Sequence, residues 1–411
     1  MAPQLLKNKR IVRKASYLDG FRCIGGVCED NCCIGWAVEI DKQTYGKYVE
    51  LKDTELKKLI GEKIYLQEES YDENVDFALV ELGRDQRCPF LNRENLCKIQ
   101  AKMGEDHLSN VCATYPRMTN EINGVLECSA TISCPEMARL ILGSREKLTF
   151  KEEKIVPARS IISLSVDTRA NGAVFPIKNL LVLRDFTITL LQMRNFPLSE
   201  RMIILGLFFQ KMEQNRGLKK PVALISFIDS FRQKLKEGKL DGEIDAFEIN
   251  EAKQFDLLLK ITNQLNDPNE IDSREYLAFI NEFRKGAGME GKKAAEQYSH
   301  AVTNFYEPFM RSREFILENY LVNHVFQSLF PAGDSVYPLD AFQKLVQRYS
   351  LIKLYLTGIG NYRKGLDEKT VIEFLQVFSK ALEHHHRYFE RLYLQMKKYK
   401  CNTMIHKDEV K

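Results

Sequence analysis

Nine of the ten cysteines lie between Cys23 and Cys134, and only Cys401 lies outside this stretch. Cysteines that only fill a core would be spread along the chain, so this concentration predicts chemistry that uses thiolates. First-choice metal ligands are Cys28, Cys32, Cys33, Cys88, Cys97 and Cys112, and second choices are Cys23, Cys128 and Cys134.

The start of the chain bears on the state of these cysteines. Met1–Lys14 is rich in lysine and arginine but is followed by no apolar run, so it does not read as a secretory signal. We therefore expect a reducing, cytoplasmic compartment, in which thiols bind metal or stay reduced and buried rather than pair as disulfides.

The spacing of the cysteines bears on which metal they could bind. No Cys-x2-Cys knuckle of the kind found in zinc ribbons occurs. Cys28 and Cys32 begin a Cys-x3-Cys-x2-Cys motif, but Gly35 stands at its third position. A [4Fe–4S] cluster accepts four thiolates from several elements and tolerates irregular spacing. The pattern favours such a cluster, with zinc as the alternative.

The cysteine region resembles the flagellin lysine-N-methylase family, and its core resembles the broader YkgJ-like family of iron- or zinc-chelating proteins. The matching stretches are Cys28–Trp36, Asp41–Tyr48, Cys88–Leu91, Leu96–Ile99, Cys112–Arg117 and Cys134–Leu140. The resemblance implies an enzyme that transfers a methyl group from S-adenosylmethionine to lysine side chains of flagellin and carries an iron–sulfur cluster. The alternative is a non-enzymatic scaffold or interaction module stapled by zinc or by a cluster.

Residues that could hold S-adenosylmethionine are harder to find. The glycine-rich turn of a Rossmann fold is missing, and Gly358–Gly360 is expected to cap a helix instead. Trp36, the only tryptophan, either shields the metal site or offers its face to the adenine or the sulfonium. Arg117 and Arg139 each follow a cysteine motif, and each forms a structural ion pair or binds the methionine carboxylate.

A long helix is predicted over Lys369–Tyr399, with an apolar seam on one face. The seam residues are Val371, Leu375, Phe378, Leu382, Phe389, Leu392 and Met396. His385 takes the missing seam position, where a histidine is either a core residue or a catalytic group near the substrate amine. Ser379–His386 resembles the family's C-terminal stretch, in which His384 is the matching histidine. Both histidines are therefore catalytic candidates.

The whole chain is predicted to be mainly α-helical. A cysteine-rich region with short strands and helices spans 15–143, a connector spans 144–175, and a larger helical portion spans 176–400. Within the first region, Asp41 is expected to begin a helix and Asn123-Gly124 to form a hairpin turn.

Composition narrows the class of protein. The 411 residues are 44% hydrophobic and 28% charged, which is typical of a soluble globular protein. The net charge of +4 is too small to indicate nucleic-acid binding, and no apolar run is long enough for a membrane span.

Overall fold

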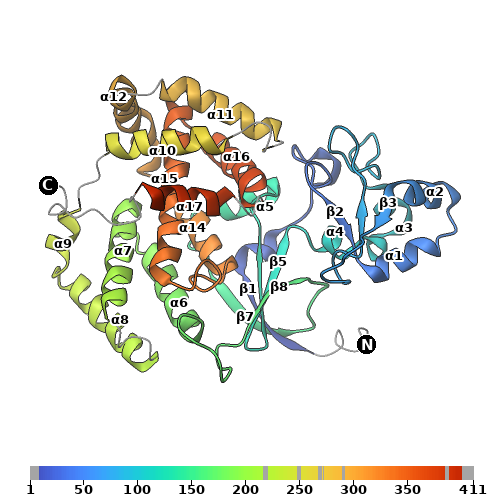
Figure 1. The fold of residues 1–411 in the computed structure, drawn as a ribbon, viewed down its shortest axis with the longest axis horizontal. Coiled ribbons are helices and arrows are strands. Elements are labelled where there is room, and N and C mark those ends of the chain that lie inside the picture. Colours follow the sequence, from blue (N-terminus) through green and yellow to red (C-terminus); the bar gives the residue numbers. More distant parts are fainter. Residues whose placement is uncertain are drawn as a thin grey trace. The chain divides into compact units, whose positions relative to one another are not determined.

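The computed structural model describes residues 9–215, 221–247, 251–266, 271, 273–288, 292–384 and 388–399. The chain forms two compact units (Figure 1). The first comprises Met1–Leu140 with Thr149–Val166, and the second comprises Ile141–Leu148 with Asp167–Lys411. The first unit carries the strands and the second is helical, so the predicted mainly α fold with a strand-containing cysteine-rich part is confirmed.

The larger sheet of the first unit has the strand order β7–β1–β6–β5–β8. Its strands are β1 (Arg10–Ala15), β5 (Arg117–Ile122), β6 (Val125–Ala130), β7 (Phe150–Ile155) and β8 (Ile162–Val166). The β1–β6 and β5–β8 pairs are parallel, and the β1–β7 and β5–β6 pairs are antiparallel. The predicted hairpin joins β5 and β6, and its turn residues Asn123 and Gly124 have φ angles of 54° and 84°.

A second, antiparallel sheet has the order β2–β4–β3. Its strands are β2 (Val38–Ile40), β3 (Ile64–Leu66) and β4 (Ala78–Val80), and helices α1 (Lys42–Val49) and α2 (Thr54–Lys63) share its core. Asp41 begins α1, and its carboxylate accepts a 2.9 Å hydrogen bond from the backbone N–H of Thr44. The predicted N-cap is therefore confirmed.

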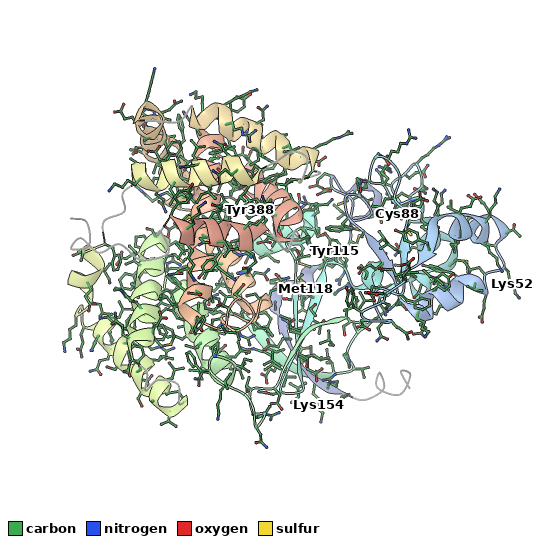
Figure 2. The ribbon with its side chains drawn as sticks, in the orientation of Figure 1. Lys52, Cys88, Tyr115, Met118, Lys154 and Tyr388 are labelled. Carbon is green, nitrogen blue, oxygen red and sulfur yellow. The ribbon has the colours of Figure 1, made fainter. Side chains whose placement is uncertain are left out.

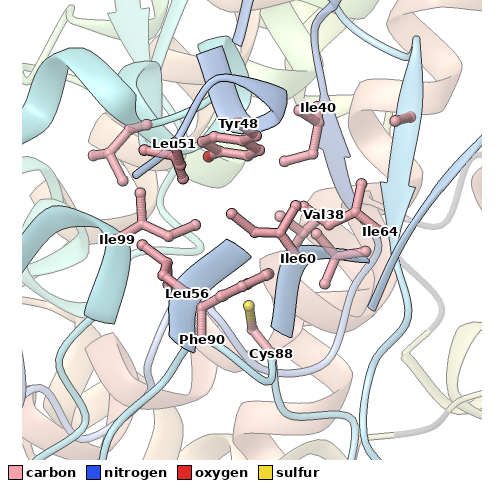
Figure 3. Close-up of a cluster of buried hydrophobic side chains, with 13 residues drawn as sticks. Val38, Ile40, Tyr48, Leu51, Leu56, Ile60, Ile64, Cys88, Phe90 and Ile99 are labelled. Carbon is pink, nitrogen blue, oxygen red and sulfur yellow. The ribbon is translucent and has the colours of Figure 1, made fainter. Parts of the chain in front are cut away.

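The core beneath this small sheet reaches the cysteines. Buried side chains from both helices and all three strands pack together, and Figure 3 shows Cys88 among them, close to Phe90. Cys33, Cys97 and Cys112 pack against the same cluster while remaining partly exposed. The thiols thus lie at the boundary between an apolar core and solvent.

Short helices complete the cysteine-rich part of the chain. They are η2 (Ser16–Gly20), η3 (Gly25–Val27), α3 (Lys98–Met103), η4 (Glu105–His107), α4 (Asn110–Thr114) and α5 (Pro135–Leu142). Cysteines stand just before or within several of them, which matters for the site described below.

The second unit is built from helices around α15 (Pro338–Arg363), which packs against α7, α10, α11, α12, α14 and α17. The other helices are η5 (Ile177–Asn179), α6 (Leu180–Leu191), α7 (Leu198–Gln214), α8 (Pro221–Lys236), α9 (Asp241–Asp245), α10 (Glu251–Leu265), α11 (Arg274–Ala287), α12 (Lys292–Ala301), η7 (Val302–Tyr306), α13 (Glu307–Met310), α14 (Phe315–Gln327), α16 (Glu368–Phe378), η8 (Ser379–Glu383) and α17 (Tyr388–Lys398). Among the described residues, no helix is both long and apolar enough to cross a bilayer.

Gly358–Gly360 lies inside α15, so the prediction of a helix-capping turn there was wrong. The reason is a close crossing of α15 with α11. A Cβ atom on Gly286 would lie 1.9 Å from the carbonyl oxygen of Gly358, and a Cβ atom on Gly358 would lie 2.5 Å from the Phe283 ring. These glycines therefore allow two helix backbones to touch, and neither of them ends a helix.

The predicted C-terminal helix is interrupted. The described residues form α16, a π-helical turn η8 and then α17, and residues 385–387 lie outside them. Most of the predicted seam is nevertheless buried: Val371, Leu375, Phe378, Leu382 and Leu392 are each fully enclosed, and Phe389 is buried, whereas Met396 near the end of α17 is half-buried.

Candidate functional site

Seven cysteines gather at the edge of the first unit's core. They are Cys28, Cys32, Cys33, Cys88, Cys97, Cys112 and Cys134. Cys32 interacts electrostatically with each of the other six, so it lies at the centre of this thiol group. Cys32 is exposed whereas Cys88 and Cys134 are buried, and the thiol group therefore faces solvent at Cys32.

Backbone hydrogen bonds hold the first cysteine segments together. The N–H of Cys88 donates to the carbonyl of Cys33 at 2.9 Å, next to a β-bridge between Ile34 and Arg87. The side chain of Asn31 accepts from the Cys33 N–H at 2.9 Å and donates to the carbonyl of Asn95, also at 2.9 Å. The loop that carries Cys32 is thus fixed against the segment that follows Cys88.

Two more thiols lie at the first turns of helices. Cys97 is the N-cap residue of α3. Its side chain makes no capping hydrogen bond, but the nearby backbone N–H groups of Gln100 and Ile99 offset part of the rise in its pKa that burial causes. Cys134 directly precedes α5, and the N–H groups of Met137 and Glu136 offset part of the rise in its pKa in the same way. Unpaired N–H groups at a helix start favour negative charge, so both positions suit a thiolate.

Asp41 fixes the segment that carries Cys112. Its second carboxylate oxygen accepts a 2.8 Å hydrogen bond from the backbone N–H of Asn110, the first residue of α4. The Ser109 hydroxyl accepts from the Cys112 N–H at 3.2 Å, and Arg159 donates to the Asn110 side chain at 2.6 Å. Asp41 thus fixes the starts of two helices, and one of them presents a thiol.

Burial raises the pKa of Cys88 to about 11, that of Cys112 to about 12 and that of Cys134 to about 11. For Cys33, the hydrogen bond with the Cys32 side chain contributes most, and the pKa rises far above its ordinary range. The thiols also raise one another's pKa, because thiolates crowded together repel. A bound cation would reverse this effect, since metal coordination favours the thiolate.

In the part of the chain that the structure describes, no three histidine, cysteine, aspartate or glutamate side chains are arranged to hold a metal ion. The chemistry of the donor set still fits an iron–sulfur cluster or zinc. Thiols from several segments interact electrostatically, and the backbone N–H groups of Phe90, Gln100 and Met137 offset part of the rise in the pKa of Cys88, Cys97 and Cys134.

The structure does not place two of the predicted ligands with the others. Cys128 lies on β6, where its sulfur is 3.7 Å from the hydroxyl of Thr119. Burial raises its pKa, and the charged neighbours that affect it are Glu127 and Lys14. Cys23 is exposed in the loop between η2 and η3. We therefore keep both outside the thiol group.

Trp36 lies beside the thiol group. Its indole N–H donates to the carbonyl of Cys32 at 2.8 Å, and its ring meets Tyr115 edge-on with centroids 5.0 Å apart. Tyr115, labelled with Cys88 in Figure 2, interacts electrostatically with Cys134 and Cys32. The two rings thus cover part of the thiol group, which favours the shielding interpretation of Trp36.

The two arginines proposed for cofactor binding have protein partners. Arg139 forms ion pairs with Glu29 and with Glu136. Arg117 donates to the carbonyl of Ala113 at 3.4 Å and lies over the ring of Phe21. Their roles in binding S-adenosylmethionine stay predictions.

In the helical unit, Glu383 is the centre of a polar cluster that the sequence did not predict. Its carboxylate accepts hydrogen bonds from the Tyr320 hydroxyl at 2.6 Å, the Ser379 hydroxyl at 2.5 Å and Arg348 at 3.0 Å. Burial alone would raise the pKa of Glu383, but Arg348, His324 and these hydrogen bonds outweigh it and lower the pKa below its ordinary value.

A second carboxylate lies close to this cluster. Asp334 accepts a 2.8 Å hydrogen bond from Ser328 and lies 3.7 Å from His324. Burial opposes the charge of Asp334, yet His324 and Arg348 lower its pKa. Half-buried titratable groups beside a π-helical turn are frequent at functional sites. The Ser379–His386 stretch marked Glu383 in the sequence, but no motif marked Asp334, His324 or Arg348.

The structure describes one of the two candidate catalytic histidines. His384 follows η8 directly and is exposed, next to Glu383 in the chain. His385 lies outside the described residues. Both assignments stay predictions.

Comparison with known proteins identifies the family. The model of the FliB lysine N-methylase C-terminal domain matches residues 184–406. This chain belongs to the FliB lysine N-methylase family. The resemblance found in the sequence is therefore confirmed, and Tyr320, Arg348, Glu383 and His384 all lie in the matched part.

Relatives cover almost the whole chain. Two proteins named lysine-N-methylase, from Salmonella choleraesuis strain SC-B67 and Salmonella typhimurium strain LT2, are each 22% identical over 383 residues, which is 91% of this chain and 92% of theirs. The flagellar biosynthetic protein FliU of Salmonella muenchen is 29% identical over 152 residues, 37% of this chain and 88% of its own. No solved structure matches this chain.

Proposed function

We propose that this protein is a protein-lysine N-methyltransferase that moves a methyl group from S-adenosylmethionine to lysine side chains of flagellin. The family match over 184–406 carries the proposal, and the two lysine-N-methylases that align with 91% of the chain support it. The flagellar name of the third relative supports flagellin as the substrate.

The reaction requires a neutral lysine amine. A free lysine has a pKa near 10.4, so its ammonium group must lose a proton before the nitrogen lone pair can attack. A bond then forms between that nitrogen and the methyl carbon, the carbon–sulfur bond breaks, and its electron pair stays on the sulfur of S-adenosylhomocysteine. Catalysis of such an in-line displacement is largely positioning.

We assign the proton acceptor to the end of η8. Glu383 is a poor acceptor, because three donors already bind its carboxylate and keep its pKa low. His384 follows it, is exposed, and carries the side chain whose ordinary pKa lies closest to neutrality. In this proposal Glu383 and its partners hold the turn that presents His384, and His385 stays the alternative.

For the metal, we propose a [4Fe–4S] cluster held by Cys32, Cys88, Cys97 and Cys112. Support comes from their mutual electrostatic interactions: Cys112 interacts with the other three, and Cys88 interacts with Cys97 and Cys32. When bound, the cluster cross-links the segments that carry its ligands, so its binding free energy adds to the stability of the fold. Zinc remains the competing occupant.

The test is methyl transfer by the full-length protein purified without oxygen. Flagellin incubated with the protein and methyl-labelled S-adenosylmethionine should acquire label on lysine, located by mass spectrometry of its peptides. Flagellin with chemically acetylated lysines is the matched control and should stay unlabelled. A colourless protein with stoichiometric zinc that leaves flagellin unlabelled would favour the scaffold alternative instead.

A further inference from the structure

We propose that an open cleft in the helical unit, of about 520 Å³, binds S-adenosylmethionine. The inference rests on the proposed function for the use of this cofactor and adds the place where it binds. The cleft volume lies within the range usual for small-molecule sites. The side chains that carry the argument are Phe305, Phe309, Arg313, Lys364, Asp367 and Glu368.

Two walls of different character form the cleft. The π-helical turn η7 and helix α13 supply the rings of Phe305, which is half-buried, and Phe309, which is buried. The end of α15 and the start of α16 supply Lys364 and Glu368. A π-helical turn departs from the regular helix and occurs frequently at functional sites. One wall is therefore aromatic and the other charged.

Charges of both signs face this cleft. The Lys364 ammonium lies 5.8 Å from the centre of the Phe305 ring and 3.4 Å from the Asn361 side-chain oxygen. Arg313 donates to Glu368 at 2.9 Å and lies over Phe309. A ligand that carries both a carboxylate and a cationic group is complementary to such a lining.

S-Adenosylmethionine has the required groups. Its carboxylate fits the ammonium of Lys364, and its adenine fits the face of Phe305. Its ribose hydroxyls and α-ammonium fit Oε2 of Glu368, since Arg145 and Arg313 both bind Oε1 of that carboxylate. The sulfonium is attracted to an aromatic ring in the same way as other cations. A substrate lysine side chain is a poorer match, because it offers no carboxylate to Lys364 and no ring to Phe305.

Gly360 leaves space for two residues of the cleft wall. A Cβ atom on Gly360 would lie 3.2 Å from Leu366 and 3.4 Å from Phe305, and both of these residues line the cleft. The absence of a side chain at Gly360 thus leaves room for the Phe305 ring and Leu366. Gly360 shapes the proposed site by packing, without the phosphate-binding turn of a Rossmann fold.

The experiment is titration calorimetry of S-adenosylhomocysteine into the full-length protein. Lys364→Gln and Phe305→Leu should each weaken binding about tenfold, since each removes one charge-assisted or aromatic contact. Lys369→Gln is the matched control: this exposed lysine on α16 lies outside the cleft and should leave the affinity unchanged. Equal thermal melting of the variants shows that they fold.

The possible results distinguish a failure of the proposed cofactor site from a failure of the proposed function. If the wild type binds and both cleft variants bind equally well, the cleft is not the cofactor site and the proposed function stands. If the variants keep this affinity but lose binding of flagellin, the cleft belongs to the protein substrate and the inference is overturned. A wild type that neither binds S-adenosylhomocysteine nor labels flagellin refutes the proposed function itself.

Discussion

The hydroxyl of Tyr320 donates a 2.6 Å hydrogen bond to Glu383, which lies 63 residues further along the chain. The bond joins α14 to the π-helical turn η8, and Arg348 of α15 reaches the same carboxylate oxygen at 3.0 Å. Three helical segments thus share one half-buried carboxylate. His384 comes immediately after that turn, so the cluster sets the position of the proposed proton acceptor.

Replacing Tyr320 by phenylalanine should destabilise the protein by about 1.5–3 kcal/mol, because a part-buried hydrogen bond to a charged group is lost. The measurement is the midpoint of urea unfolding. Tyr337→Phe is the control, since the Tyr337 side chain is exposed and its removal should change the midpoint little. Equal midpoints for Tyr320→Phe and the wild type would show that the bond contributes nothing.

The Glu383 cluster should also make stability depend on pH. The folded-state pKa of Glu383 is lowered by Arg348, His324 and the hydroxyl donors. Its contribution is therefore present above the unfolded pKa, near 4.3, and is lost as the pH falls through the lower folded-state value. The difference in melting temperature between the wild type and Glu383→Gln should be largest near pH 6 and shrink below pH 4. A difference that stays constant across this range contradicts the assignment.

Serine substitutions test the proposed cluster ligands. Cys88→Ser, Cys97→Ser and Cys112→Ser should each lose most of the iron and lower the solubility, because a ligand that ties distant segments also contributes folding energy. Cys23→Ser and Cys128→Ser are the controls and should keep the iron of the wild type. Iron analysis and visible absorption of anaerobically purified protein make the measurement. If all three ligand variants keep the full iron content of the wild type, the proposed ligands are wrong.

Trp36 offers a direct signal of occupancy, because it is the only tryptophan and its indole N–H binds the carbonyl of Cys32. Reconstitution with iron and sulfide should quench its fluorescence, since a cluster that absorbs visible light would lie beside the ring. Reconstitution of Cys97→Ser under the same conditions should leave the emission unchanged. Unquenched emission in a fully loaded wild type would place the cluster away from Cys32.

The close crossing of α11 and α15 should not tolerate a side chain in place of glycine. Gly358→Ala should cost about 1–3 kcal/mol, because the new Cβ atom would lie 2.5 Å from the Phe283 ring. Gly242→Ala, in α9, is the matched control: nothing lies within 4 Å of its Cβ position, and alanine there should be neutral or stabilising. Urea unfolding of the two variants decides the point, and equal effects would contradict the close crossing.

The sequence could predict the crowding of thiols and the local features that short-range chemistry sets. Asp41 caps α1, and Asn123 turns the β5–β6 hairpin, because each of these depends on neighbouring residues alone. Which of the nine cysteines lie together could not be predicted in this way. Cys128 lies on a strand next to Thr119, and only strand pairing reveals that placement.

The other differences between prediction and structure arise from contacts between residues far apart in the sequence. Tyr320 and Arg348 occupy ordinary helical positions, and only the packing of α14, α15 and η8 brings them to Glu383. Gly358 looks like a helix breaker in isolation, and its meaning depends on Gly286, a residue of another helix. A pattern read along one segment does not contain that information.

Cys32 is the exposed member of the thiol group, whereas Cys88 and Cys134 are buried and the other four thiols are half-buried. In the proposed centre, iron and sulfide delivered by an assembly protein would arrive by way of Cys32. Oxygen can use the same route. The opening that makes maturation of the centre possible would therefore also set how long it survives in air.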